Sequence, residues 1–488
     1  MSRRRLLPAL LLLSAVAWSG WRVALPYLLA LRTGTMYDAS LYRLHRFTPP
    51  SLANPTVLRF GPDGALYVAT RAGLIHRLPV RETGGKLSLG AGETIGLIAE
   101  LPNHNDRGEP EPRVRGRLIT GLAVAGSAAA PVLYVSSSDP RIERPEIDTN
   151  SGVLSRLTRD GPGWRRDDLV RGLPRSRYDH APNGAALSAD GRSLYLSIGA
   201  MTNMGAPSEP FLHLREYPLA GAVLAIDLER TGAGPFDLPT RGAKRVFGGE
   251  GGANAAVLPA DGPVRLHAEG LRNAYSLLMT PAGMFTIDNG ANAGFGGPPR
   301  EGEPDAEVEG GVQALNPLYW IHSGGLNFGQ ANPARPRPVR PPEAALRFFE
   351  SSTNGLALSS YAPDTGRMEL AAASLDGVLY ALDVDTRARR FLGRRALAVN
   401  LGGMPLDVTI ACSGTVSPGS LWIADMGSSA LFALEPLRDA AARNAVWRRE
   451  PLRTLAMRAL LWWMPVRLDL DAAFNGALRG KDAPARGR

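Results

Sequence analysis

The sequence predicts an all-β protein that folds as a six-bladed β-propeller, and two observations lead to that prediction. The chain has 55 glycines and 40 prolines among its 488 residues, and so many turn-forming residues favour short strands over long helices. Six segments also repeat one pattern of an apolar strand, a turn and a second strand. Because one such hairpin cannot bury both of its faces, six of them favour stacking around a central axis, with two β-sandwiches as the alternative architecture.

The six repeated segments indicate where the blades are expected. They are VLRFGPDGALYVAT from Val57, GLAVAGSAAAPVLYVSSS from Gly121, GAALSADGRSLYLSIGA from Gly184, YSLLMTPAGMFTIDNGA from Tyr275, RMELAAASLDGVLYALD from Arg367 and DVTIACSGTVSPGSLWIAD from Asp407. In the first and third segments the chain turns at Asp-Gly, a pair that tolerates the backbone angles of tight hairpins. The propeller domain is therefore predicted to span residues 36–436.

Long polar loops separate these segments, notably residues 103–117, 139–150, 201–218 and 290–311. Loops of this length are uncommon in a compact domain unless they carry a function or are disordered. On a propeller they are expected to gather on one face around the central axis.

Residues 1–35 are predicted to be a signal peptide or an N-terminal membrane anchor. Arg3 to Arg5 precede an apolar run from Leu6 to Trp21, and Ala15-Val16-Ala17 has the small-residue pattern of a signal-peptidase site. The positive-inside rule leaves the arginines in the cytoplasm and places the rest outside. The protein is therefore predicted to be exported, periplasmic or extracytoplasmic, and to associate with a membrane if residues 1–35 are retained.

The C-terminal residues 437–488 depart from the hairpin pattern. The stretch RNAVWRREPLRTLAMRALLWWMPVRLDL mixes arginine with leucine, methionine and tryptophan at nearly helical spacing. It is predicted to be a short basic amphipathic helical tail. Such a helix either lies on a membrane surface or packs on the propeller wall, and the sequence does not separate the two.

The net charge of +9 does not indicate a nucleic-acid partner, because much of the excess lies near the two ends of the chain and no zinc-finger or RNA-binding motif accompanies it. The single cysteine excludes an intrachain disulfide and a metal cage of cysteines.

His180 and the pair Arg272-Asn273 are the candidate functional residues. His180 follows Asp179 and directly precedes the third hairpin, and a neutral imidazole near pH 7 can take a proton from a substrate hydroxyl. A structural histidine is the alternative interpretation. Arg272 and Asn273 stand where a strand is about to be buried, so they either hold a loop together or face a ligand.

Three segments carry a resemblance to a known family. DHAPNGAALSADGRSLYLSIG, GLRNAYSLLMTPAGMFTIDNGAN and GGLNFGQANP resemble motifs of the quinoprotein glucose/sorbosone dehydrogenase family, the PQQ-dependent soluble aldose sugar dehydrogenases. They occur in the family's order, and the resemblance covers roughly residues 57–434. It implies a six-bladed propeller, in agreement with the repeat count.

The resemblance also implies a reaction, which is oxidation of an aldose or related sugar hydroxyl by hydride transfer to PQQ. It gives His180 and Arg272 catalytic roles as base and as the group that stabilises charge on the quinone. It implies that Arg272 and Asn273 bind the cofactor, and that Asp288, Asn289 and Gly290 bind Ca²⁺, a cation that prefers oxygen ligands. The substrate is expected to be a small sugar, and no electron acceptor is implied.

Four departures from the family pattern leave other functions open. Ala200 stands where the family has an aspartate that orients the base, and Asp179, Glu209 and Glu216 are the candidate replacements. The other departures are Arg117-Leu118 near Gly116, where the family has a glutamine or glutamate, Asp305 and Glu307 as loose matches to an acidic stretch, and Leu406-Asp407 where basic residues are expected.

Two alternative functions follow from these departures. The first is a non-catalytic envelope propeller that binds carbohydrate or protein. The second is a metal-dependent, lactonase-like propeller hydrolase whose metal is bound by oxygens drawn from Asn183, Asn203, Asn273, Asp288 and Asn292.

Overall fold

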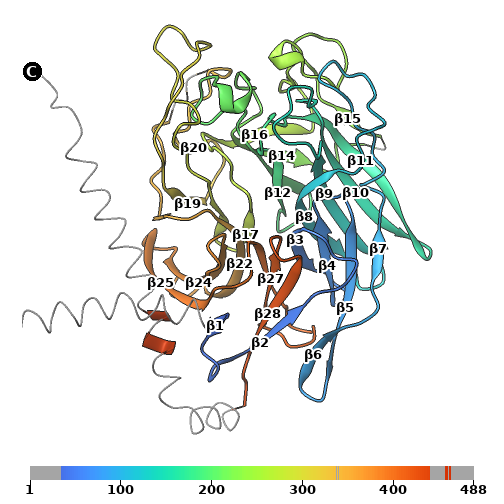
Figure 1. Ribbon diagram of the computed structural model, residues 1–488, viewed down its shortest axis with the longest axis vertical. Helices are drawn as coiled ribbons and strands as arrows, with labels where there is room; N and C mark the ends of the chain where they lie inside the picture. Colours follow the sequence, from blue (N-terminus) through green and yellow to red (C-terminus); the bar gives the residue numbers. More distant parts are fainter. Residues whose placement is uncertain are drawn as a thin grey trace, which may run out of the picture.

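The computed structural model describes residues 34–232, 234–336, 338, 340–439, 457–459 and 461–462. Within these residues six sheets are arranged around a common centre, so the protein is a six-bladed β-propeller (Figure 1). The predicted fold class is confirmed, and the two-sandwich alternative is wrong. Residues 1–33, which contain nearly all of the predicted signal or anchor segment, lie outside the described residues.

The first three blades begin in chain order, and blades 2 and 3 each take their outermost strand from farther along the chain. Blade 1 contains β3 (Pro55–Phe60), β4 (Ala65–Thr70), β5 (Ile75–Thr83), β6 (Lys86–Leu89) and β7 (Glu93–Ile95). Blade 2 contains β8 (Leu118–Gly126), β9 (Pro131–Ser138), β10 (Gly152–Asp160), β11 (Gly163–Leu173) and β15 (Phe236–Asp237). Blade 3 contains β12 (Pro182–Leu187), β13 (Ser193–Ile198), β14 (Ala222–Asp227), β16 (Val264–Glu269) and β20 (Leu326–Asn327). The outermost strands β15 and β20 pair in parallel, whereas the others are antiparallel.

The remaining blades include the N-terminal strands. Blade 4 contains β17 (Leu278–Thr280), β18 (Gly283–Ile287), β19 (Asn316–Ile321) and β21 (Arg347–Phe349). Blade 5 contains β22 (Thr353–Ala362), β23 (Arg367–Ser374), β24 (Leu379–Asp385), β25 (Arg390–Val399) and β1 (Met36–Tyr37). Blade 6 contains β26 (Pro405–Ile410), β27 (Leu421–Asp425), β28 (Ala430–Pro436) and β2 (Tyr42–Phe47).

The ring is closed by pairing of the two ends of the domain. Strand β2 pairs with β28 from Tyr42 opposite Pro436 to Phe47 opposite Leu431, and β1 adds an edge to β25. His45 and Glu435 contact each other across the β2–β28 pair at 2.8 Å. The N-terminal strands therefore complete blades 5 and 6, and this closure ties the last blade to the start of the chain.

The first strand of each blade lies next to the first strand of the following blade, and glycine permits that close approach. A Cβ on Gly121 of β8 would lie 2.0 Å from the backbone oxygen of Asn183 in β12. A Cβ on Gly355 of β22 would lie 2.5 Å from the backbone nitrogen of Val408 in β26. No side chain fits at such separations, which explains why glycine stands at these two positions of the inner strands.

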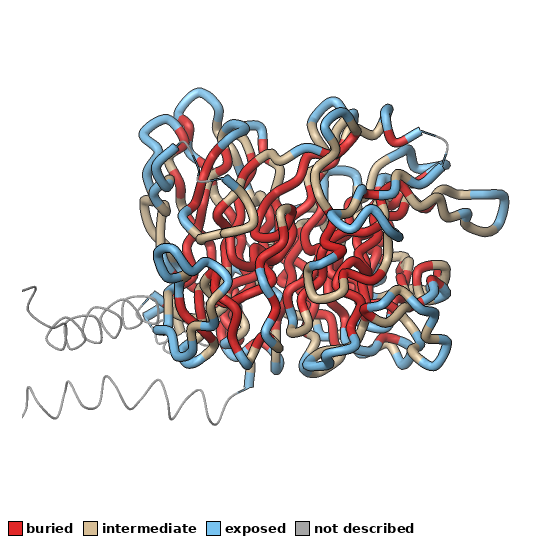
Figure 2. The backbone as a smooth tube through the Cα atoms, turned by 90° about the horizontal axis from the view of Figure 1, so that it is seen from above, coloured by how far each residue is buried: buried red, intermediate tan, exposed pale blue. Residues whose placement is uncertain are grey.

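The apolar core fills the space between neighbouring blades. One cluster joins Phe285 and Leu318 of blade 4 to Leu370 and Leu382 of blade 5, and other clusters repeat this arrangement around the ring. Buried residues occupy the middle of the molecule, and exposed residues lie on the peripheral loops and hairpin ends (Figure 2). Burial between blades is therefore the main source of stability, as expected for a repeat architecture.

Five of the six predicted hairpins are the first two strands of a blade, and the fifth is not. The segment from Arg367 forms β23 and β24, which are the second and third strands of blade 5. The inner strand of that blade is β22, whose sequence is TNGLALSSYA. The number of blades was predicted correctly, but the position of the hairpin within blade 5 was wrong by one strand.

Part of the C-terminal segment packs on the propeller. Leu461 is buried in the core cluster that contains Met36, and Arg458 donates to Asp38 at 2.6 Å and to Ser40 at 2.8 Å. For residues 457–459 and 461–462 these contacts favour packing on the wall over a membrane surface. No helix in the described part of the chain is long and apolar enough to span a membrane.

Candidate functional site

The predicted site residues gather at one edge of blades 3 and 4. His180 lies just before β12, and Ala200 lies just after β13. Arg272 and Asn273 precede β17, and Asp288 follows β18. In an antiparallel hairpin the first strand begins at the end where the second strand finishes. All of these residues therefore lie at the same end of the strands in their blades.

His180 is a buried histidine with one unpaired ring nitrogen. Its Nδ1 lies 2.7 Å from the backbone oxygen of Ala200, and its Nε2 is buried and has no hydrogen-bond partner. Since a carbonyl oxygen only accepts, Nδ1 carries the proton and the lone pair is on Nε2. Burial, with a contribution from Arg272, lowers the pKa of His180 well below its ordinary value. The imidazole is therefore neutral near pH 7 and able to accept a proton at Nε2.

Two side chains, those of Asp179 and Phe211, lie close to the His180 imidazole. The nearer carboxylate oxygen of Asp179 lies 3.7 Å from Nε2, and the Asp179 side chain is half exposed. The ring of Phe211, in a short 3₁₀ helix (Glu209–Phe211), lies 5.0 Å from the His180 ring and is fully buried. A substrate therefore reaches Nε2 past Asp179 or after Phe211 moves.

Ala200 connects His180 to Arg272. Its carbonyl accepts the His180 Nδ1–H, and its own N–H donates to the backbone oxygen of Arg272 at 2.7 Å. The Arg272 guanidinium donates through Nη2 to Asn203 Oδ1 at 2.8 Å and through Nη1 to the backbone oxygen of Asn289 at 3.2 Å. The candidate base and the candidate cation are thus fixed by one continuous network.

Asp288 caps the backbone of the Arg272-Asn273 pair. Its two carboxylate oxygens accept the backbone N–H groups of Arg272 at 2.8 Å and of Asn273 at 2.6 Å. Burial raises the pKa of Asp288 to about 6, although these hydrogen bonds oppose the shift. Asn273 accepts the Nδ2–H of Asn183 at 2.8 Å through its side-chain oxygen. Asp288 therefore holds the loop that carries Arg272.

The predicted calcium ligands already bond to protein. Asn289 Oδ1 accepts from Ser352, and its backbone oxygen accepts from Arg272. The backbone nitrogen of Gly290 donates to Asn316 at 3.0 Å. Among the residues that the structure describes, no three carboxylate, histidine or cysteine side chains form a metal-binding group. Calcium binding by Asp288, Asn289 and Gly290 stays a prediction, in which the ion uses their remaining lone pairs.

One of the oxygens considered for a hydrolytic metal, Asn203 Oδ1, bonds a guanidinium. Asn203 Oδ1 accepts two nitrogens of Arg272 and the backbone N–H of Asn292. A divalent cation at this position would meet the positive charge of Arg272 as well as occupied lone pairs. The Arg272 guanidinium therefore disfavours a metal at Asn203 Oδ1.

The residues present fit two requirements of an anionic quinone cofactor. The orphaned Nε2 of His180 provides a base, and Arg272 provides a positive charge in the same network. The fit to calcium is weaker, since the side-chain oxygens of Asp288 and Asn289 each accept a hydrogen bond from protein.

Sequence reasoning missed the role of Ala200. The orienting group is its backbone carbonyl, which any residue type carries, so residue identity gave no signal. Glu216, one of the candidate orienters, does not bond His180. It accepts the backbone N–H groups of Met201 and Thr202 at 3.1 and 3.0 Å, which fixes the segment directly after Ala200.

The other departures from the family pattern also have structural roles. Asp305 and Glu307 lie in exposed ion pairs with Arg215 and His213, so the 201–218 and 290–311 loops contact each other as expected for loops gathered on one face. Arg117 is fully buried and donates to Asn103 Oδ1 at 3.0 Å. Asp407 bonds Arg59 of blade 1 at 2.5 Å.

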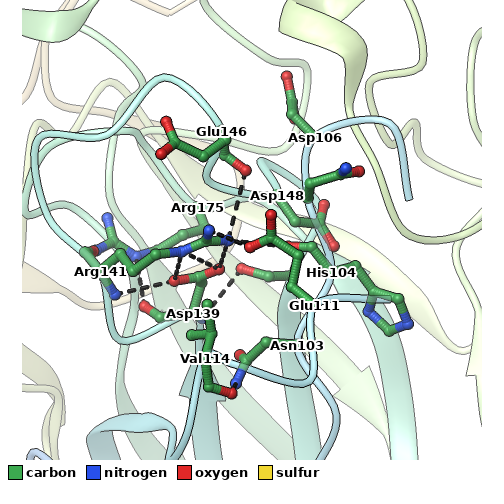
Figure 3. Close-up of polar contacts among 12 residues, drawn as sticks. Asn103, His104, Asp106, Glu111, Val114, Asp139, Arg141, Glu146, Asp148 and Arg175 are labelled. Atoms are coloured by element: carbon green, nitrogen blue, oxygen red, sulfur yellow. Dashed lines mark hydrogen bonds and ion pairs between the residues drawn. The ribbon is translucent and has the colours of Figure 1, made fainter. Parts of the chain in front are cut away.

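A second polar cluster is joined to His180 by Arg175, which donates to the His180 carbonyl. Asp139 is fully buried, and its carboxylate accepts from Arg141 at 2.6 to 3.2 Å. Figure 3 shows Arg141 and Arg175 gathered around Asp139. A pocket of about 620 Å³ opens near this cluster and is lined by polar side chains that include Asn105, Asp106, Glu146, Arg177 and Glu250.

Comparison with known proteins supports the fold. No family model and no curated protein matches the chain. A calcium structure of a Trichoderma reesei enzyme of carbohydrate-active family AA12 is 13% identical, with a TM-score of 0.51 over 83% of this chain and 97% of that one.

Two further solved structures are similar at lower scores. A glucose dehydrogenase-like oxidoreductase of Thermus thermophilus is 18% identical, with a TM-score of 0.47 over 80% of this chain and 99% of that one. The PQQ domain of pyranose dehydrogenase from Coprinopsis cinerea is 10% identical, with a TM-score of 0.48 over 80% and 97%. At 13% identity the likeness to the AA12 enzyme shows the propeller fold alone, and the other two likenesses add nothing to it.

Proposed function

We propose that this protein is an exported PQQ-dependent oxidoreductase that oxidises a sugar hydroxyl. The observation that carries the proposal is the state of His180. It is neutral, it is held by a carbonyl at Nδ1, its Nε2 is unpaired, and the charge of Arg272 contributes to its lowered pKa. His76 of blade 1 also has a buried, unpaired Nε2, so what distinguishes His180 is its connection through Ala200 to the buried Arg272.

In the proposed reaction His180 takes the hydroxyl proton at Nε2 while the adjacent carbon loses hydride. PQQ, when bound, supplies the quinone that accepts this hydride, so the sugar is oxidised by two electrons and the quinone is reduced by two. Arg272 contributes its positive charge, which favours an anionic partner in a site with little water. The resemblance of the motifs around His180 and Arg272 supports this assignment.

Calcium, the sugar substrate and export belong to the same proposal. Asp288, Asn289 and Gly290 are the residues assigned to the ion, through the lone pairs that the hydrogen bonds from protein leave free. Residues 1–35 are assigned the export or anchoring role.

Titration of the full-length protein with PQQ, with and without calcium, tests the proposal. We expect binding detected by the quinone absorbance, stronger with calcium, and weakened at least tenfold by Arg272→Gln. Arg117→Gln, which removes another buried arginine, is the matched control and should bind as the wild type does. Absence of PQQ binding to the folded wild type would contradict the proposal.

A further inference from the structure

We propose that Arg175 is a positioning residue for His180. Arg175 holds the loop of residues 176–180 so that the imidazole stays in position and its Nε2 stays unprotonated. This inference rests on the proposed function of His180 as a base. Arg175 directly precedes this loop, and His180 ends it. The hydrogen bonds of Arg175 go to backbone oxygens rather than to the imidazole ring. Its effect on the ring is therefore transmitted through the backbone.

The Arg175 side chain is fully buried and donates only to backbone oxygens. Its Nη1 donates to the carbonyls of Ser176, Tyr178 and His180 at 2.7, 2.9 and 2.9 Å. Its Nη2 donates to the carbonyl of Arg141 at 2.7 Å, and its Nε donates to that of Asp139 at 3.3 Å. Three of these five acceptors belong to the loop that ends in His180.

A buried arginine at position 175 lowers the stability of the fold unless its several guanidinium donors are needed. A buried guanidinium loses hydration, and an apolar side chain of similar volume is often no less stable. The nearest carboxylate, Asp139, is bonded by Arg141, as Figure 3 shows. Burial lowers the pKa of Arg175 to about 10, so the group still carries its charge near pH 7. Only a planar fork with several donors can hold carbonyls from two directions.

The loop that Arg175 holds is closed on itself. The N–H of Ser176 donates to the His180 carbonyl at 3.0 Å, and Ser176 Oγ accepts the His180 N–H at 3.1 Å. Arg175 donates to the same His180 carbonyl. The backbone of His180 is thus fixed by Ser176 and Arg175, while its ring is fixed by Ala200. The positive charge of Arg175 also adds to the lowering of the His180 pKa, after burial and Arg272.

The test compares Arg175→Lys with Arg117→Lys in full-length protein labelled with ¹⁵N-histidine. Both arginines are fully buried, but Arg117 donates to Asn103 and Ser151 and not to the 176–180 loop. The ring nitrogens of His180, assigned with His180→Gln, report its tautomer and its titration without any cofactor. Lysine keeps the charge but cannot hold five carbonyls.

We expect the wild type and Arg117→Lys to show one His180 tautomer, protonated at Nδ1, that does not titrate near pH 6.5. In Arg175→Lys we expect mixed tautomers or a titration midpoint raised by about one pH unit or more. If the protein also reduces quinone, kcat in Arg175→Lys should fall about 10- to 100-fold with KM changed less than about twofold.

Unchanged His180 signals in folded Arg175→Lys would overturn the inference. If Arg175→Lys does not fold, Arg175→Gln replaces it with the same expected result. If neither folds while Arg117→Lys does, Arg175 serves the fold in general, and the inference is also overturned. A wild type that never reduces quinone would contradict the proposed function alone, because the nitrogen signals do not depend on turnover.

Discussion

A backbone carbonyl determines which nitrogen of His180 carries its proton. Because the Ala200 oxygen lies 2.7 Å from Nδ1, the tautomer does not depend on any side chain at position 200. The usual carboxylate partner would also stabilise a charged imidazolium, whereas a carbonyl does so less strongly. The arrangement therefore suits a base that starts neutral.

The pH dependence of sugar oxidation follows from this environment. The pKa of His180 is lowered, so the imidazole is already deprotonated at pH 6.5, where an ordinary histidine is half protonated. We expect kcat/KM to stay within about twofold between pH 7.5 and 6, and to fall only at lower pH. Stopped-flow measurement of quinone reduction across this range checks the prediction. A tenfold fall from pH 7.5 to 6 would contradict it.

Asp148 provides a separate prediction about stability. It is fully buried, and burial raises its pKa from 3.8 to about 8. Between these values the native state binds more protons than the unfolded state, so the contribution of Asp148 to stability falls as the pH rises from about 4 to 8. Relative to Asp148→Asn, the wild type should lose up to about 1.4 kcal/mol in free energy of unfolding per pH unit.

Urea unfolding of both proteins at pH 5, 6 and 7 measures that difference. Asp261→Asn is the control, since its carboxylate is largely exposed, and its difference from the wild type should stay nearly constant. A constant difference for Asp148→Asn as well would show that its carboxyl group is not protonated in the native protein.

At the scale of elements, the glycines of the inner strands set the spacing between blades. In Gly121→Ala the new methyl group would overlap the backbone oxygen of Asn183, 2.0 Å away. Because a strand backbone cannot move without disturbing its ladder, we expect a loss of about 2 kcal/mol or more in free energy of unfolding. Gly393→Ala in β25 meets no atom within 4 Å and should change it by less than about 0.5 kcal/mol. Equal effects would contradict this packing argument.

The same elements show what the sequence could predict. Strand patterns and turn residues identified a hairpin in every blade, because they depend on local backbone preferences. They did not show that the hairpin from Arg367 lies one strand away from the axis. The Asp376-Gly377 turn between β23 and β24 resembles a turn between inner strands, since turn chemistry does not depend on distance from the axis.

For the site, sequence predicted which loops meet but not how they bond. His180, Arg272, Asn273 and Asp288 lie at one edge because their hairpins are adjacent in the ring. The Ala200 carbonyl and the Arg175 fork act through the backbone, which carries no residue signature. Such contacts between distant segments are evident only in the folded structure.

At the scale of the molecule, closure of the ring depends on the N-terminal strands. Strand β2 completes blade 6, and β1 adds to blade 5. A chain that begins at residue 48 would expose the β28 edge and the apolar groups beneath it, so we expect it to aggregate or to melt at least about 10 °C lower. A chain that begins at residue 34 keeps both strands and should stay monodisperse. Thermal melts and size-exclusion chromatography compare the two, and equal melting temperatures would contradict the closure argument.

The proposed function of the whole molecule depends on one chemical step, in which Nε2 of His180 takes the proton from the sugar hydroxyl. Single-turnover reduction of protein-bound PQQ by an aldose tests it most directly, in the wild type, His180→Gln and the control His76→Gln, which replaces a buried histidine of blade 1. We predict that PQQ binds all three, and that only His180→Gln reduces it at least about 100-fold more slowly. Reduction by His180→Gln at the wild-type rate would contradict the account.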